Sequence, residues 1–326
     1  MAKVLLVSTA RTKKDFLDDD YERVKRSAAR DSFKVHSITE DPDAADLIIF
    51  FEPDDHWLAR DVRTHPFVRR YSEKVFLVDG SDRVVPFLPG VYASIERSRY
   101  DRSRVRSGFF PFVYDYDWIT YQPDGPAPTL LFSFVGSKQE LRVREEILTL
   151  EHPRALIRDT SDYPENEGGL PEGRYDSYRA EFARVLQASA FILCPTGAGT
   201  ATPRFFEAMK AGRVPVIVSD NWVPPEGPRW DEFSLRVRER DVRSIPDILA
   251  PLESRAAAMG RLAREEFERW FSEPVCFHRI VEWCVSIRAS RRLPERLMRR
   301  VVLWQLLRPF NFRRKLVPAV VAAFKR

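Results

Sequence analysis

The stretch that decides the fold runs from Ala190 to Asp220 and reads AFILCPTGAGTATPRFFEAMKAGRVPVIVSD. It opens with an apolar run, Ala190–Cys194, which a proline ends, as is typical of a buried strand. A second apolar run, Val214–Val218, is continuous, as in a parallel strand that is covered on both faces. Between them, a helix ended by Gly212 completes a strand–helix–strand unit. The stretch therefore predicts a doubly wound, parallel α/β sheet.

The loop before this helix has little side-chain bulk. Residues 196–200 read TGAGT, so a ligand could approach the backbone closely. A helix N-terminus behind such a loop presents free N–H groups and suits a phosphate. Arg204 lies on the first helical turn, where a guanidinium can clamp a diphosphate through paired hydrogen bonds. Glu207 follows on the same helix face and could accept hydrogen bonds from ribose hydroxyls.

Two series of alternating apolar strands and polar helices follow one another along the chain. The first begins with the strand Lys3–Ser8. Proline and glycine accumulate between the two series, and we place the linker at about Tyr121–Pro128. We predict two Rossmann-like domains, residues 1–122 and 129–285, and a basic helical tail at 286–326. Two such domains hold a ligand in the central cleft between them, at the carboxyl ends of the strands.

Composition excludes several classes of protein. A chain of 326 residues with 44% hydrophobic residues and a mean hydropathy of −0.36 is globular and long enough for two domains. It has no run of about 18 apolar residues, so we expect no membrane-spanning helix. Its three cysteines form no Cys-x-x-Cys pair and indicate neither a disulfide framework nor a cysteine zinc site. The N-terminus resembles an opening strand rather than a secretory leader, and we expect a cytoplasmic protein.

The net charge of +5 arises in the C-terminal segment. Residues 290–326 hold eleven Lys and Arg residues and one Glu, so the rest of the chain carries a net negative charge. We therefore expect no nucleic-acid partner. Apolar residues between these cations, such as Val301–Trp304, predict an amphipathic helix that binds an anionic membrane surface. The alternative is a closing helix that packs on the first domain.

Several spaced motifs occur in a definite order around the deciding stretch. FSFVGS at residues 132–137 precedes Cys194-Pro195, which is followed by RFFEA at residues 204–208 and GRVPVI at residues 212–217. With these motifs, the chain resembles exostosin-like glycosyltransferases over roughly residues 129–285. The resemblance implies the two-domain GT-B fold and inverting transfer of a sugar. The donor would be a nucleoside-diphosphate sugar of the UDP or GDP type, and the acceptor a hydroxyl of a glycan or glycolipid.

The same resemblance implies a donor site on the second domain. Arg204 would bind the diphosphate and Glu207 the ribose. Backbone contacts would come from the small-residue loop, namely from Gly197, Ala198, Gly199 and Thr200. Four further polar residues near strand ends could also contact the donor: Arg142, Arg144, Arg158 and Asp220. For the arginines after the FSFVGS strand the alternative is a solvated helix face, and for the aspartate it is a capping role.

The catalytic base is left open by the sequence. Inverting transfer needs a base for the acceptor hydroxyl and positive charge for the departing diphosphate. Acidic residues near strand ends of the first domain are candidates, in the order Asp79, Asp82 and Glu52, with His56 nearby. Each is also a common turn or cap residue. Asp115-Tyr116-Asp117 forms an Asp-x-Asp pattern, but its aromatic, proline-bounded setting leads us to expect no obligatory metal.

These observations predict an inverting, metal-independent glycosyltransferase in surface polysaccharide or lipopolysaccharide synthesis, peripheral to the inner face of a membrane. The nucleotide sugar would be its co-substrate, and no cofactor would be obligatory. One alternative is a non-catalytic nucleotide- or glycan-binding partner with a degenerate site. Another is a fucosyltransferase-like enzyme of the same architecture, although its Glu-Lys nucleotide motif is not visible in this chain.

Overall fold

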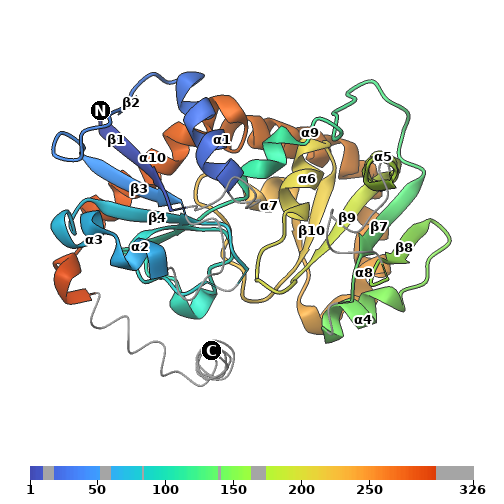
Figure 1. The fold of residues 1–326 in the computed structure, drawn as a ribbon. Helices are drawn as coiled ribbons and strands as arrows, with labels where there is room; N and C mark the ends of the chain where they lie inside the picture. Colours follow the sequence, from blue (N-terminus) through green and yellow to red (C-terminus); the bar gives the residue numbers. More distant parts are fainter. Residues whose placement is uncertain (10–17, 52–59, 83, 139–140, 163–173, 299–326) are drawn as a thin grey trace.

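The structure is a computed structural model, and the residues it describes are 1–9, 18–51, 60–82, 84–138, 141–162 and 174–298. Two α/β halves lie side by side, each built around a parallel sheet (Figure 1). The predicted fold class is therefore confirmed. Glu52, His56 and most of the predicted basic tail lie outside the described residues. None of the described helices is long and apolar enough to cross a membrane.

The first sheet has the strand order β2-β1-β3-β4-β5-β6, and all its strand pairs are parallel. Its strands are β1 (Lys3–Ser8), β2 (Ser37–Ile38), β3 (Leu47–Phe51), β4 (Val75–Asp79), β5 (Gly90–Tyr92) and β6 (Val105–Ser107). The helical elements of this half are α1 (Asp18–Ala29), α2 (Arg60–Thr64), α3 (Pro66–Arg70), η1 (Arg97–Arg99) and η2 (Pro111–Asp115). Helices α2 and α3 are separated at His65, which caps α3 by accepting the Phe67 N–H at 3.2 Å, and Pro66 occupies the first helical position of α3.

The second sheet has the strand order β11-β10-β9-β7-β8 and is also parallel. Its strands are β7 (Leu130–Gly136), β8 (Ala155–Asp159), β9 (Ser189–Pro195), β10 (Val214–Val218) and β11 (Leu235–Arg236). The helices that surround it are α4 (Arg142–Leu148), α5 (Arg174–Ala188), α6 (Arg204–Lys210), α7 (Trp230–Phe233), η4 (Glu239–Ser244), α8 (Ile245–Leu249), η5 (Ala250–Leu252) and α9 (Glu253–Trp270). The predicted β9–α6–β10 unit is thus confirmed, and every residue of both its strands is buried.

Helix α6 stops at the predicted glycine. Gly212 has a φ of 68°, a left-handed conformation that residues with a Cβ adopt at a cost. Its N–H donates to the Met209 carbonyl at 3.0 Å, and the Arg213 N–H donates to the Ala208 carbonyl at 2.8 Å. These two bonds form a Schellman motif, which satisfies the last carbonyls of the helix and directs the chain into β10.

Aromatic packing joins the two halves. Phe109 from the first half has its ring centroid 6.0 Å from that of Phe206 on α6 and 5.1 Å from that of Phe271. The chain then returns to the first half through α10 (Glu273–Ser290), which lies beside α1 and also contacts β5 (Figure 1). Together with these aromatic contacts, the buried residues form an apolar core that is continuous from one half to the other.

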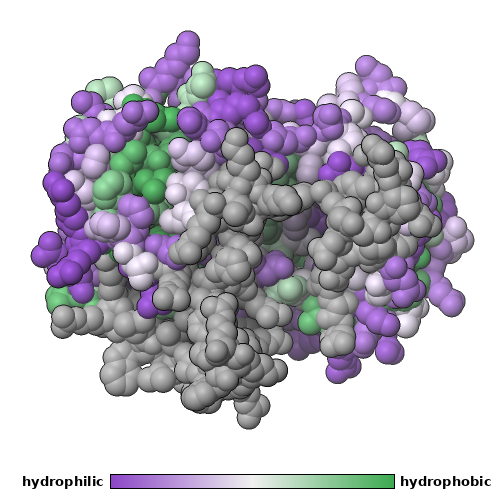
Figure 2. Space-filling view, in the orientation of Figure 1, coloured by the Kyte–Doolittle hydropathy of each residue, from purple (hydrophilic) through white to green (hydrophobic). Residues whose placement is uncertain are grey.

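Hydrophilic residues cover much of the visible described surface, and hydrophobic residues gather over β1 and β3 (Figure 2).

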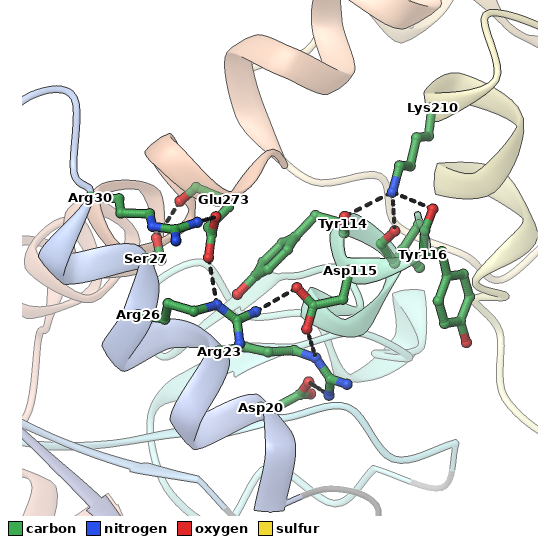
Figure 3. Close-up of polar contacts among 11 residues, drawn as sticks. Asp20, Arg23, Arg26, Ser27, Arg30, Tyr114, Asp115, Tyr116, Lys210 and Glu273 are labelled. Atoms are coloured by element: carbon green, nitrogen blue, oxygen red, sulfur yellow. Dashed lines mark hydrogen bonds and ion pairs between the residues drawn. The ribbon is translucent and has the colours of Figure 1, made fainter. Parts of the chain in front are cut away.

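A polar cluster reinforces this junction (Figure 3). Asp115 at the end of η2 accepts hydrogen bonds from Arg23 at 2.7 Å and from Arg26 at 2.5 Å. Arg26 also donates to Glu273, the first residue of α10, at 2.6 Å. On the other side of η2, the Lys210 ammonium donates to the carbonyls of residues 113, 114 and 116 at 3.1, 2.7 and 2.7 Å. The cluster connects α1, η2, α10 and α6.

We expect Lys210→Met to destabilise the protein by about 2 kcal/mol or more, because it leaves three carbonyls without the buried donor that satisfies them. Urea unfolding measures this loss. Lys25→Met, on the exposed side of α1, is the matched control and should cost less than about 0.5 kcal/mol. Equal unfolding midpoints for the two variants would contradict the role given to Lys210.

Candidate functional site

The small-residue loop after β9 is a folded turn with internal bonds. The Gly197 N–H and the Thr196 hydroxyl both donate to the Gly199 carbonyl at 3.0 Å. The Thr200 hydroxyl donates to the Ile95 carbonyl of the first half at 3.4 Å, and the Thr200 carbonyl accepts from Ser219 at 2.8 Å. The loop is therefore held in one shape between the two halves.

Gly199 is needed for the contact between the halves. A Cβ atom at this position would lie 2.5 Å from the Ser94 hydroxyl and 2.8 Å from the Asp82 carbonyl, closer than packed atoms come. The sequence suggested that the small loop lets a ligand approach. At Gly199, the structure shows instead that the missing side chain lets the first half approach. As a consequence, Asp82 lies directly beside the loop that precedes α6.

Arg204 begins α6 and is the central cation of the site. Its guanidinium carbon lies 5.3 Å from the ring centroid of Phe134 and 5.7 Å from that of Phe182. A Cβ at Gly136, on β7, would lie 3.2 Å from both of its terminal nitrogens. Among the described residues, its buried Nε and Nη1 atoms find no hydrogen-bond partner. Buried donors without acceptors are costly, and a bound anion would satisfy them.

Arg144 supports this cation from α4. It is 5% exposed and donates to the Thr196 carbonyl through Nε and to the Ser137 carbonyl through Nη1, both at 2.8 Å. Burial lowers the pKa of Arg144 to about 10, with a further lowering by Arg204 and an opposing effect of Asp82. Arg144 therefore remains charged at neutral pH, joins the loops after β7 and β9, and adds positive potential next to Arg204.

Glu207 lies one turn further along α6. Its side chain is 8% exposed, and burial raises its pKa to about 7, although the positive charges of Arg204 and Lys210 act in the opposite direction. Near neutral pH the carboxyl group can therefore either accept a hydrogen bond or donate one. Lys210, another turn away, has its pKa lowered to about 8 by burial and by Arg264.

The remaining predicted donor residues have partners of their own. The Arg142 side chain is 89% exposed and bonds Glu146 at 2.8 Å, so it lies on the solvated helix face. Arg158, at the end of β8, pairs with Glu181 on α5. The Asp220 carboxylate accepts the Glu239 N–H at 3.3 Å, and the Glu239 carboxylate accepts the Asp220 N–H at 3.0 Å, a reciprocal cap of η4. Ala198 lies exposed in the loop.

The acidic candidates of the first half have different surroundings. Asp79 ends β4, and its carboxylate accepts the Ser81 N–H at 2.7 Å. Asp82 is exposed, its backbone faces Gly199, and its charge acts on Arg144. In the Asp-x-Asp pattern, Asp115 is an ion-pair partner of α1 and belongs to the polar cluster of Figure 3.

Sequence reasoning missed the aromatic surroundings of Arg204. Phe134 belongs to the FSFVGS motif. Nothing in the local sequence, however, indicates its contact with Arg204, which lies 70 positions further along the chain. Ser94 was also missed; its hydroxyl is buried, and it has no hydrogen-bond partner within the described part of the chain.

Comparisons with known proteins agree on one family. The model of the exostosin GT47 domain matches residues 91–252. The exostosin-1 homolog of Caenorhabditis elegans is 36% identical over 93 residues, which are 28% of this chain and 24% of that protein. The probable glucuronoxylan glucuronosyltransferase IRX7 of Arabidopsis thaliana is 43% identical over 82 residues, 24% of this chain and 17% of that protein. The matched segments thus span about a quarter or less of these relatives.

Solved structures with a similar course of the chain share little sequence with it. A glycosyltransferase from Rickettsia africae has a TM-score of 0.40 and 10% identity, covering 87% of this chain and 98% of that one. Anabaena HepE in complex with UDP-glucose has a TM-score of 0.38 and 10% identity, covering 88% and 100%. The fold assignment rests on the two parallel sheets described above.

Glu207 predicts a pH-dependent difference in stability. Its folded pKa of about 7 lies above the ordinary value of 4.5, so the folded state holds this proton more tightly than the unfolded chain does. The wild type therefore loses stability as the pH rises from about 4.5 to 7, whereas Glu207→Gln does not titrate. The variant should gain up to about 3 kcal/mol relative to wild type between pH 4.5 and 8.

Urea unfolding at a series of pH values measures this difference. Glu145→Gln, which removes an exposed carboxyl group from α4, is the control for the loss of one charge. A stability difference between Glu207→Gln and wild type that stays constant across this pH range would contradict the raised pKa.

Proposed function

Because residues 91–252 place this chain in the exostosin-like glycosyltransferase family, we propose that it transfers a sugar from a nucleoside-diphosphate donor to a hydroxyl of a glycan or lipid-linked acceptor. The observation that carries the proposal is the state of Arg204. This cation is held between aromatic rings, and its buried nitrogens have no acceptor among the described residues. An anionic ligand such as a diphosphate supplies the acceptors that are missing.

In the proposed reaction, Arg204 stabilises the diphosphate as it leaves. Negative charge grows on the bridging oxygen when the bond to the sugar breaks, and a preorganised cation lowers the free energy of that state. The aromatic faces of Phe134 and Phe182 exclude water around the guanidinium, which strengthens its interaction with an anion. Arg144 adds a second positive charge without leaving its two carbonyl partners.

Glu207 is proposed to bind the ribose of the donor. It follows Arg204 by three residues, so both side chains lie on one side of α6. A carboxyl group one helical turn from the residue that binds the diphosphate can hydrogen-bond a sugar hydroxyl in either protonation state. Both UDP and GDP carry such a ribose, and the test below distinguishes between them.

Asp79 and Asp82 are proposed as the alternative bases that take the acceptor proton. Asp82 has the favourable position beside the Gly199 loop, where its charge already acts on Arg144. The transfer is proposed to be a single displacement with inversion and without a metal. We also propose that the protein acts in surface polysaccharide synthesis at the cytoplasmic face of a membrane. The basic segment after residue 290 would contribute to binding that membrane.

The donor site can be tested by thermal unfolding with UDP and GDP, with and without Mn²⁺. A bound nucleotide at 100 times its Kd should stabilise the wild type by about 2.7 kcal/mol. Arg204→Ala should abolish this stabilisation and lower sugar transfer by about 100-fold or more, because the charge on the leaving group is no longer balanced. Arg142→Ala, which removes an exposed arginine nearby in the chain, is the matched control.

The outcomes separate the possibilities. Stabilisation by one nucleotide, independent of Mn²⁺ and lost only in Arg204→Ala, would support the donor site. It would also identify the nucleobase of the donor as uracil or guanine. Stabilisation that survives in Arg204→Ala would place the donor elsewhere. No stabilisation by either nucleotide would favour a non-catalytic member of the family.

A further inference from the structure

Away from α6, three side chains with metal-ligating atoms meet at the edge of the first sheet. His36 directly precedes β2, the edge strand, and His278 and Glu282 lie on α10. One ligand atom from each of the three residues lies within 4.8 Å of the other two. The group joins segments that are more than 240 residues apart in the chain, and none of its members belongs to the site around Arg204.

His36 directs one ring nitrogen into this group. Its side chain is 2% exposed, and its Nδ1 atom accepts the Ala2 N–H at 3.2 Å. The opposite nitrogen, Nε2, lies 2.9 Å from the Glu282 carboxylate. In this orientation of the ring, Nε2 faces Glu282.

His278 supplies the second imidazole in a fixed orientation. Its ring stacks on Phe33 with the centroids 3.9 Å apart, and it lies 5.0 Å from the ring of His36. The residue is 8% exposed, and its buried Nδ1 atom has no hydrogen-bond partner among the described residues. A nitrogen that is buried without a partner in a polar cluster points to a missing ligand.

Glu282 completes the group with an adaptable oxygen. It follows His278 by four residues, so both side chains project from the same face of α10. Its side chain is 48% exposed and can adjust its position, whereas the two imidazoles are buried. A buried carboxylate, Asp31, adds negative charge near His278, and Arg279 adds one positive charge.

We propose that His36, His278 and Glu282 bind a zinc ion through Nε2, Nδ1 and a carboxylate oxygen, with water in the fourth position. Two imidazoles and a carboxylate are a donor set that zinc accepts, whereas Mg²⁺ and Ca²⁺ prefer oxygen ligands. When the metal binds Nε2 of His36, the ring proton moves to Nδ1 and the Ala2 hydrogen bond is given up. The ion would fasten α10 to the edge of the first sheet.

The test uses the full-length protein without a histidine tag, stripped of metal and titrated with Zn²⁺ by calorimetry and thermal unfolding. We expect one saturable zinc site per chain and a rise in Tm, and no effect of Mg²⁺ at the same concentration. Glu282→Gln should weaken zinc binding at least tenfold, and His278→Gln should abolish it. His152→Gln, a substitution in the turn before β8, should bind zinc as the wild type does.

Because His278 is buried, the His278→Gln variant can fail to fold. The zinc affinity of Glu282→Gln, a substitution at a half-exposed position, then tests the proposal. Absence of saturable zinc binding by the wild type would overturn the proposal. So would zinc binding by a folded Glu282→Gln variant with the affinity of the wild type, or equal binding of Mg²⁺.

Discussion

Helix α6 is buried on almost every side, and the structure around it is built to accommodate the charged side chains that the helix carries. Six of its seven residues are buried, and the charges of Arg204, Glu207 and Lys210 follow one another at three-residue intervals. A buried charge is stable only with partners. Lys210 has three carbonyls, Glu207 lies between two cations, and Arg204 has aromatic faces but leaves two nitrogens without acceptors. The helix thus joins the halves at one end and carries, at the other, a cation with two buried nitrogens that have no acceptor among the described residues.

The fold was predictable where local chemistry decides it. The β9–α6–β10 unit follows from two apolar runs and a glycine, and Gly212 occupies the left-handed position that such a stop requires. The place of α10 against α1 could not be predicted, because a helix pattern does not specify the partner of its apolar face. Strands of three residues, such as β5 and β6, carry too few side chains for a periodic pattern.

The candidate site was predictable in its residue types but not in its contacts. Arg204 and Glu207 lie one turn apart on α6, the helix that the sequence predicted for them. Arg142 and Arg144 looked alike in the sequence, yet a difference of two positions turns one into solvent and the other toward the loops after β7 and β9. Asp115 shows the same limit: its ion pairs reach α1, about 90 residues away, and no local pattern contains them.

The return of the chain to its first half has a consequence for the order of assembly. Ser27 on α1 bonds the backbone of α10 at two points, accepting the Phe277 N–H and donating to the Glu273 carbonyl, across about 250 residues. During synthesis the first sheet is therefore complete as a polypeptide long before the helix that covers it exists. The part of its apolar surface that α10 covers stays exposed until nearly the whole second half has left the ribosome. The halves resemble separate domains in shape, but α10 follows the second half in the sequence and packs on the first, so the packing of the first half is completed only after the second half has been synthesised.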